Sequence, residues 1–215
     1  MAQTGPTSPR ERYRAQVREE IKQRAWAQIA TAGASALSLN AIAKQMGVSG
    51  PALYRYFANR DELITELITD AYRSQADAVA AAATAGADLA GLADVVRQWA
   101  LADPHRYFLI YGTPVPGYHA PDDVTAIAAE IMAVLLDAAA ALPADERDGP
   151  FDSHLESHRE WARGHPAPPA VLHRTLTFWT RLHGVLSLEL AGHFTGMGFD
   201  PALLFAAERD ELTQR

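Results

Sequence analysis

The sequence predicts an all-α protein, with a three-helix unit at the N-terminus and a helical bundle after it. Apolar residues recur at three- and four-residue intervals through most of the 215 residues, and this spacing places side chains on one face of a helix. No segment shows the short alternation of apolar and polar residues that is typical of a β-strand. Glycine and proline fall between the periodic segments, where helices end or begin.

Composition narrows the class of protein further. A chain of this length buries a real core, as one domain or as two small ones. Cysteine is absent, which excludes disulfides and thiolate metal sites and fits a reducing cytoplasm. Residues 1–9 lack the apolar region of a signal peptide and are expected to form a disordered polar tail. Since no apolar run has membrane-spanning length, we expect a cytoplasmic protein without a membrane partner.

The first helix is expected from Arg10 to Thr31. Its apolar residues have helical spacing, and its outer face is basic. The inward residues are Tyr13, Val17, Ile21, Ala25 or Trp26, and Ile29. The sequence Ala32-Gly33-Ala34 should end this helix.

The stretch from Leu37 to Phe57 predicts two short helices joined by a tight turn. Ser38 is expected to cap a helix from about Leu39 to Met46. Gly47 follows the last periodic residue, where a helix ends most easily in the left-handed conformation that glycine adopts without penalty. Ser49 is positioned to cap the second helix, from about Pro51 to Phe57, and a proline in the first turn suits a helix start. This arrangement is a helix-turn-helix.

The second of these helices has an exposed face suited to nucleic acid. Leu53 and Phe57, four residues apart, point inward and leave Tyr54, Arg55 and Tyr56 outside. Phosphates and base edges are suitable partners for an aromatic-basic-aromatic surface at a helix N-terminus. The competing interpretation is a core helical hairpin whose tyrosines merely cover its edge.

Charge distribution favours the nucleic-acid interpretation. The whole chain carries a net charge of −7, but residues 10–60 hold nine basic and three acidic residues, or +6. The remainder therefore carries −13. A basic first quarter joined to an acidic body is expected when one small domain meets phosphate and the rest has another role.

Helical periodicity continues to the C-terminus. A helix from Asp61 to about Ala83 is long enough to leave the first unit and enter a second one. A loop is expected at residues 112–121, which contain two glycines and three prolines. Further helices are expected at residues 87–102, 104–111, 124–142, 151–163, 170–194 and 201–212. We thus expect a helix-turn-helix domain at residues 10–60 and a second domain at residues 61–215.

The segment from about Arg14 to Tyr72 resembles the N-terminal domain of TetR-family transcriptional regulators. The resemblance rests on the opening basic helix, on Leu-x-x-Ile-Ala-x-x-Met-Gly-Val-Ser, and on Pro-Ala-Leu-Tyr-Arg-Tyr-Phe-Ala-Asn-Arg-Asp-Glu-Leu. About ten residues around Phe178-Trp-Thr-Arg-Leu-His-Gly resemble the Trp…His-Gly signature of one subgroup's effector domain. The resemblance implies a homodimer that binds an operator in double-stranded DNA and acts as a repressor released by a small effector.

The resemblance also assigns roles to individual residues. Tyr54, Tyr56 and Arg60 correspond to positions that contact phosphate in the family, and Arg55 is the candidate for reading a base, with guanine O6 and N7 as its partners. Gly50 departs from the family pattern, in which a lysine or glutamine is common, so readout depends more on Arg55, Asn40 and backbone contacts. Ser38 is expected to donate to phosphate or to act only as a cap. The remaining expected DNA-contacting residues are Ser49, Pro51 and Ala52.

The body of the protein is expected to bind the effector. The candidate residues are aromatic or imidazole side chains on helices near its centre, and each competes with a role as plain core. They are Trp99, Phe108, Tyr111, Trp161, Trp179 and His183. The aromatic run near Tyr107 and the loop at residues 112–121 are the first place to look, which implies an apolar or aromatic ligand.

Metal and catalytic chemistry have little support in the sequence. His154 and His158 are four residues apart on an expected helix, a spacing that lets two imidazoles share an ion, and His165 follows. Further ligands cannot be identified, so surface histidines are the alternative and no cofactor is expected. There is no Gly-x-Ser-x-Gly elbow, glycine-rich phosphate loop or cysteine nucleophile. We expect no enzyme, although a helical small-molecule-binding protein or enzyme with an N-terminal docking unit is the alternative.

Overall fold

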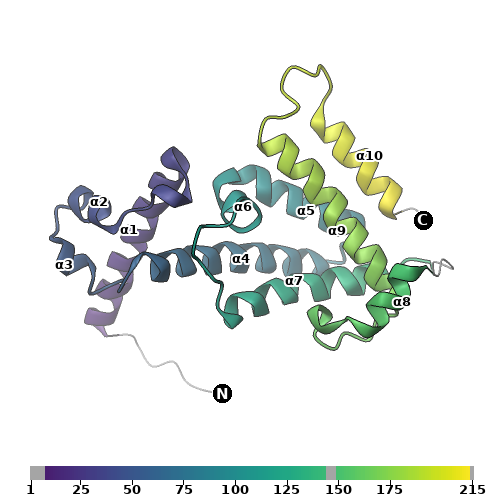
Figure 1. Ribbon diagram of the computed structural model, residues 1–215, viewed down its shortest axis with the longest axis horizontal. Helices are drawn as coiled ribbons and strands as arrows, with labels where there is room; N and C mark the ends of the chain where they lie inside the picture. The colour runs from purple at the N-terminus through teal and green to yellow at the C-terminus, as the bar shows by residue number, and fades with distance from the viewer. Residues whose placement is uncertain (1–7, 144–148, 214–215) are drawn as a thin grey trace.

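The computed structural model describes residues 8–143 and 149–213, and every regular element in these ranges is a helix (Figure 1). The prediction of an all-α fold is confirmed for this part of the chain. The elements are α1 (Pro9–Ala32), η1 (Ala34–Ala36), α2 (Leu39–Gln45), α3 (Gly50–Leu53), α4 (Arg60–Thr84), α5 (Leu89–Ala102), α6 (Pro104–Tyr111), α7 (Asp122–Ala140), α8 (Pro150–Ser157), η2 (Glu160–Ala162), α9 (Pro169–Leu190) and α10 (Pro201–Thr213).

The molecule has two ends joined by a long helix. Helices α1 to α3, here called the head (residues 9–57), lie at one end, and helices α5 to α10, here called the body (residues 89–213), lie at the other (Figure 1). Helix α4 runs from the head into the body. Its first half places Leu63, Ile64 and Leu67 in the core of the head, whereas Ala76 and Val79 lie in the core of the body. The domain boundary at residue 60 remains a prediction, because α4 contributes to both cores.

Helix α1 has well-defined ends but a shorter buried stripe than its periodicity suggests. The hydroxyl of Ser8 accepts from the Glu11 backbone N–H at 3.2 Å, and the Glu11 carboxylate accepts from the Ser8 N–H at 2.7 Å, so a capping box starts the helix. Gly33, with φ of +79°, ends it. The expectation that Tyr13 points inward was wrong, since its side chain is 64% exposed. Tyr13 lies on the first turns, before the buried stripe begins, at Ile21.

The helix-turn-helix is confirmed, with a shorter second helix than expected. The Ser38 hydroxyl accepts from the Ala41 N–H at 3.3 Å, and Gly47 has φ of +67°. Helix α3 ends at Leu53, and Tyr54 to Tyr56 form turns in which the Tyr56 N–H donates to the Leu53 carbonyl at 2.8 Å. This three-residue spacing tightens the chain, so the expected helix to Phe57 was too long.

The expected side-chain cap by Ser49 was wrong. Ser49 occupies the N-cap position of α3, but its hydroxyl makes no capping hydrogen bond. The second residue of the helix is Pro51, which has no N–H, and the third residue, Ala52, donates to the backbone carbonyl of Ser49 at 3.0 Å. Both backbone donors that a capping hydroxyl normally binds are therefore absent or already used.

Two helices of the body end earlier than their apolar pattern predicts. Helix α8 stops at Ser157 and not at residue 163, because His158 leaves the helical region and Arg163 and Gly164 have positive φ. Helix α9 stops at Leu190 and not at residue 194, where a segment with three positive-φ glycines follows. The expected loop at residues 112–121 is confirmed. Within the described ranges, no helix has both the length and the apolar character needed to cross a membrane.

Candidate nucleic-acid interface and effector site

The start of α2, the start of α3 and the turn after α3 form one continuous surface on the head, here called the reading surface. A Cβ atom added to Gly50 would lie 3.4 Å from the Asn40 Oδ1 atom, so the two helix starts touch. Asn40, Ser49 and Pro51 are exposed, and Ala52 is half-buried. The members are the predicted residues Ser38, Asn40, Ser49, Gly50, Pro51, Ala52, Tyr54, Arg55 and Tyr56.

Arg55 is the most accessible cation of the reading surface. Its side chain is exposed and makes no hydrogen bond or ion pair with the described residues. Tyr54 beside it is 44% exposed. Tyr56 differs from the outward-facing residue that the spacing predicts, because its ring packs partly against the core of the head. The expected trio thus presents two exposed side chains, Tyr54 and Arg55, and one half-buried one, Tyr56.

Arg60 lies at the start of α4, but its guanidinium is directed to the backbone of the head. It donates to the carbonyl oxygens of Leu37 at 3.2 Å, Ala34 at 2.8 Å and Ser35 at 3.3 Å. These bonds tie α4 to the η1 segment. The family resemblance implies a phosphate contact for Arg60, and this contact stays a prediction. The hydrogen bonds to the backbone of the head are a structural role that the spacing of apolar residues does not reveal.

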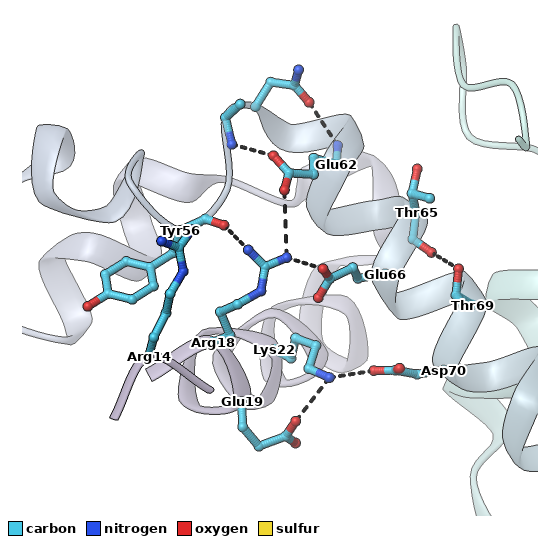
Figure 2. Close-up of polar contacts among 12 residues, drawn as sticks. Arg14, Arg18, Glu19, Lys22, Tyr56, Glu62, Thr65, Glu66, Thr69 and Asp70 are labelled. Atoms are coloured by element: carbon cyan, nitrogen blue, oxygen red, sulfur yellow. Dashed lines mark hydrogen bonds and ion pairs between the residues drawn. The ribbon is translucent and has the colours of Figure 1, made fainter. Parts of the chain in front are cut away.

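Two further arginines of α1, Arg14 and Arg18, lie near Tyr56 of the reading surface (Figure 2). Arg14 donates to the carbonyl oxygen of Arg55 at 3.3 Å, and Arg18 donates to the carbonyl oxygen of Tyr56. Arg18 also pairs with Glu66 of α4. In the sequence, both arginines are recognisable only as part of the basic outer face of the first helix.

In the body, three of the predicted effector residues meet in an aromatic cluster. Ring centroids of Tyr111 and His183 lie 4.4 Å apart, those of Trp179 and His183 4.0 Å, and those of Tyr111 and Trp179 5.5 Å. Trp99 and Phe108 pack against the same core, and the Trp99 indole N–H donates to the Ser74 hydroxyl at 3.1 Å. Trp161 lies elsewhere, against a separate small core around Leu136 and Leu155.

Polar groups that sequence reasoning missed complete this cluster. Gln75 of α4 is fully buried, and its Oε1 atom accepts from the Tyr111 hydroxyl at 2.6 Å. The Tyr107 hydroxyl lies 3.0 Å from His183 Nδ1 and 2.8 Å from the Ser187 hydroxyl. The Nε2 atoms of Gln75 and His183 are buried and have no hydrogen-bond partner among the described residues. The sequence does contain one indication of a buried polar group here, because Gln75 interrupts the apolar stripe of α4 between Ala71 and Val79.

Burial changes the acid–base properties of the cluster. Desolvation raises the pKa of Tyr111 well above its usual value and lowers the pKa of His183 to about 4. His183 is therefore neutral in the folded protein at neutral pH.

Acid should destabilise the folded protein, because the His183 side chain takes up a proton more readily in the unfolded chain. Its pKa of about 4 lies below its ordinary value of 6.5, so the unfolded chain binds a proton between these pH values that the folded protein does not bind. We expect this group to lower the free energy of unfolding by up to about 3 kcal/mol as the pH falls from 6.5 to 4. Urea titrations of the wild type and His183→Asn across this range measure the effect. Equal pH slopes in the two proteins would contradict it.

A cavity of about 430 Å³ lies where the head meets the body. The C-terminal end of α1 and η1 form one side, and Phe108 of α6 and the loop after α6 form the other. Its lining is mostly apolar and includes Ile29, Leu109, Pro114 and Val115. The sequence indicated this loop as the first place to look for a ligand.

The histidines near the end of α8 lie on the surface of the body. The rings of His154 and His158 stack with their centroids 4.0 Å apart, and the carbonyl oxygen of His154 lies 2.9 Å from His158 Nδ1. In the ranges that the structure describes, no three His, Asp or Glu side chains are grouped so as to hold a metal ion.

Both parts of the chain match known protein families. Residues 21–67 match "Bacterial regulatory proteins, tetR family", and residues 89–212 match "Tetracyclin repressor-like, C-terminal domain". The resemblance to the Trp…His-Gly subgroup stays a prediction.

Similar proteins cover nearly the whole chain. The HTH-type transcriptional regulator Rv1816 of Mycobacterium tuberculosis is 36% identical, over 97% of this chain and 95% of that protein. The crystal structure of the protein SCO4313 has a TM-score of 0.90 and 72% sequence identity, and the alignment covers 97% of this chain and 100% of that one. A protein of unknown function from Rhodococcus sp. RHA1 shares the fold, with a TM-score of 0.67 and 20% identity over 100% of this chain and 98% of that one.

Proposed function

Because this chain belongs to the TetR family and is a TetR-family transcriptional regulator, we propose that it is a homodimeric repressor which leaves a near-palindromic operator when a small, largely apolar effector binds. Members of this family bind DNA and are not enzymes, so the alternative of an enzyme with a docking unit is set aside. We further propose that it acts in the cytoplasm. The observation that carries the proposal is the exposed, unpaired Arg55 side chain in the turn after α3, on the reading surface.

Different residues of the reading surface are expected to contact bases and phosphates. Arg55 reaches a guanine in the major groove, where a guanidinium binds O6 and N7 together. Tyr54 and Tyr56 contact phosphates beside it, and Ser38, Ser49, Pro51 and Ala52 approach the backbone or the groove edge. Because Gly50 adds no side chain, Asn40 remains exposed at the same place and can also meet a base. Arg60 contributes to this surface mainly by holding η1.

The operator is tested by selection from random duplexes with the purified protein. We expect an enriched near-palindrome with half-sites centred about one DNA turn apart, roughly 34–36 Å or somewhat more. Affinity for that duplex should fall steeply with salt, as phosphate contacts require. Selection that enriches no sequence would overturn the proposal.

Helices α9 and α10 support a dimer. Arg181 of α9 pairs with Glu208 and Glu211 of α10, which holds the two helices together. Large apolar side chains on this part of the body are exposed, including Leu188 at 45% and Leu203 at 71%. An exposed apolar surface of this kind is typical of a protein interface.

A charge on this surface should separate the dimer. We expect Leu203→Glu to sediment as a monomer at concentrations at which the wild type sediments as a dimer, because burying an unpaired carboxylate is costly. Leu101→Glu, on an exposed residue of α5, is the matched control and should leave the dimer intact. A dimeric Leu203→Glu protein would place the interface elsewhere.

The aromatic cluster and the cavity beside it support an effector site. Phe108 lines the cavity and packs against the same hydrophobic core as Trp99, Tyr111 and Trp179, and the His183 ring contacts Tyr111 and Trp179. Gln75 and His183 do not line the cavity, but their buried Nε2 atoms have no partner among the described residues and would offer two hydrogen-bonding groups to a largely apolar ligand that enters the aromatic cluster. Trp161 lies apart from this site. A screen of aromatic and apolar compounds for release of operator DNA tests the assignment, with Tyr111→Leu expected to weaken the response.

A further inference from the structure

The turn after α3 carries two backbone carbonyls that its own backbone does not satisfy. Because α3 ends at Leu53, the carbonyl oxygens of Arg55 and Tyr56 receive no backbone N–H donor among the described residues. Arg14 and Arg18 of α1 supply charged donors instead. Hydrogen bonds from ionised donors are stronger than neutral ones, so α1 holds this turn firmly.

Arg18 is also fixed from two other directions. Its guanidinium lies 4.1 Å from the centre of the Phe57 ring, and it pairs with Glu66 and, at 3.6 Å, with Glu62 of α4 (Figure 2). Glu62 in turn accepts from the Ala58 N–H at 2.5 Å. One side chain thus joins α1, the turn after α3 and the first two turns of α4.

A second ion pair lies one turn further along the same two helices. The Lys22 ammonium of α1 lies 2.7 Å from the Asp70 carboxylate of α4 and 3.0 Å from Glu19. The side chains of Arg18 and Lys22 are only 22% and 17% exposed, so both pairs are partly shielded from water and salt. Two neighbouring ion pairs therefore link α1 to α4 at successive turns, beside the apolar core that the two helices share.

We propose that Arg18 is a positioning residue for DNA reading, acting with Glu66. Together they fix the turn of residues 54–56 relative to α4, and this determines where Tyr54 and Arg55 meet the groove. The inference rests on the proposed function. It assigns to a basic side chain of the head a role that does not involve touching DNA.

Glu66→Gln tests the proposal because two explanations predict opposite changes in affinity for the operator. Removing a negative charge near DNA should tighten binding if only long-range electrostatics matters. Loss of positioning should weaken binding to the selected operator by about tenfold, since the charge-assisted bond is lost in both heads. Binding to a scrambled duplex should not weaken, and the salt slope should stay the same. Fluorescence anisotropy with the two duplexes measures both.

Two further variants complete the experiment. Glu20→Gln is the matched control. It removes a charge of the same sign from α1, and among the described residues Glu20 pairs only with Arg24, at 3.4 Å. It should bind the operator at least as tightly as the wild type. Arg18→Lys keeps the charge but loses the fork that binds Tyr56 and Glu66 together, and it should behave like Glu66→Gln. Thermal unfolding of each variant identifies any that is not folded at the assay temperature.

The outcomes separate this inference from the proposed function. If the folded Glu66→Gln and Arg18→Lys proteins bind the operator as tightly as Glu20→Gln does, Arg18 has no positioning role. A further variant, Arg18→Ala, tests for a phosphate contact. If Arg18→Lys binds normally while Arg18→Ala lowers the salt slope by about 0.9 for each head of the dimer, Arg18 is a phosphate ligand instead. A wild type with no sequence preference would overturn the proposed function itself.

Discussion

Arg55→Ala should lose most of its preference for the selected operator. A bidentate arginine–guanine contact is worth about 1–3 kcal/mol, and a dimer makes it twice, so we expect a loss of about 30-fold to 10⁴-fold in specific affinity. Binding to a scrambled duplex should weaken far less. The effect is large because Gly50 carries no side chain and leaves Arg55 as the main cation able to choose a sequence.

Lys44→Ala is the control for Arg55→Ala. Lys44 is also exposed on the head and carries the same charge. If it meets only phosphate, its loss should weaken both duplexes by a similar factor and lower the salt slope by about 0.9 per contact. Equal losses for both duplexes in the Arg55→Ala protein would show that Arg55 positions the head without reading a base.

Phe57→Ala should cost about 3–5 kcal/mol of folding free energy, as other buried aromatic truncations do. The Phe57 side chain has no exposed surface, and it packs in the core of the head. Its ring also faces the Arg18 guanidinium, so the truncation removes a cation–π contact as well as core packing. Urea denaturation followed by circular dichroism measures the change.

Tyr13→Ala is the matched aromatic control for Phe57→Ala. Because the Tyr13 side chain is 64% exposed, its truncation should change stability by less than about 0.5 kcal/mol. A large loss in the Tyr13 variant, or a small one in the Phe57 variant, would contradict the core that the structure shows.

The helices of the head were predictable because local signals agree there. The Ser38 cap, the left-handed Gly47 and the apolar stripe each act within four residues and point to the same helix-turn-helix. The length of α3 was not predictable in this way. The turn that follows α3 is held by Arg14 and Arg18, which are 41 and 38 residues away from their carbonyl partners. A spacing argument cannot detect contacts at that separation.

The candidate sites were predictable only in residue type. Aromatic residues of the body were identified, and Tyr111, Trp179 and His183 do meet. Trp161 has the same chemistry but lies in another core, because its place depends on how α7, α8 and η2 pack. Arg60 illustrates the opposite limit, since a basic residue at a helix start has the same pattern whether it contacts phosphate or backbone carbonyls.

Because α4 is shared by two hydrophobic cores, it determines how the protein unfolds. Its residues between Leu63 and Val79 belong to two hydrophobic cores in succession, and Tyr72 packs against both. If either core comes apart, α4 loses the apolar contacts on half its length, and an isolated helix of that kind is only marginally stable in water. Head and body should therefore unfold together in one cooperative transition, despite their different tasks.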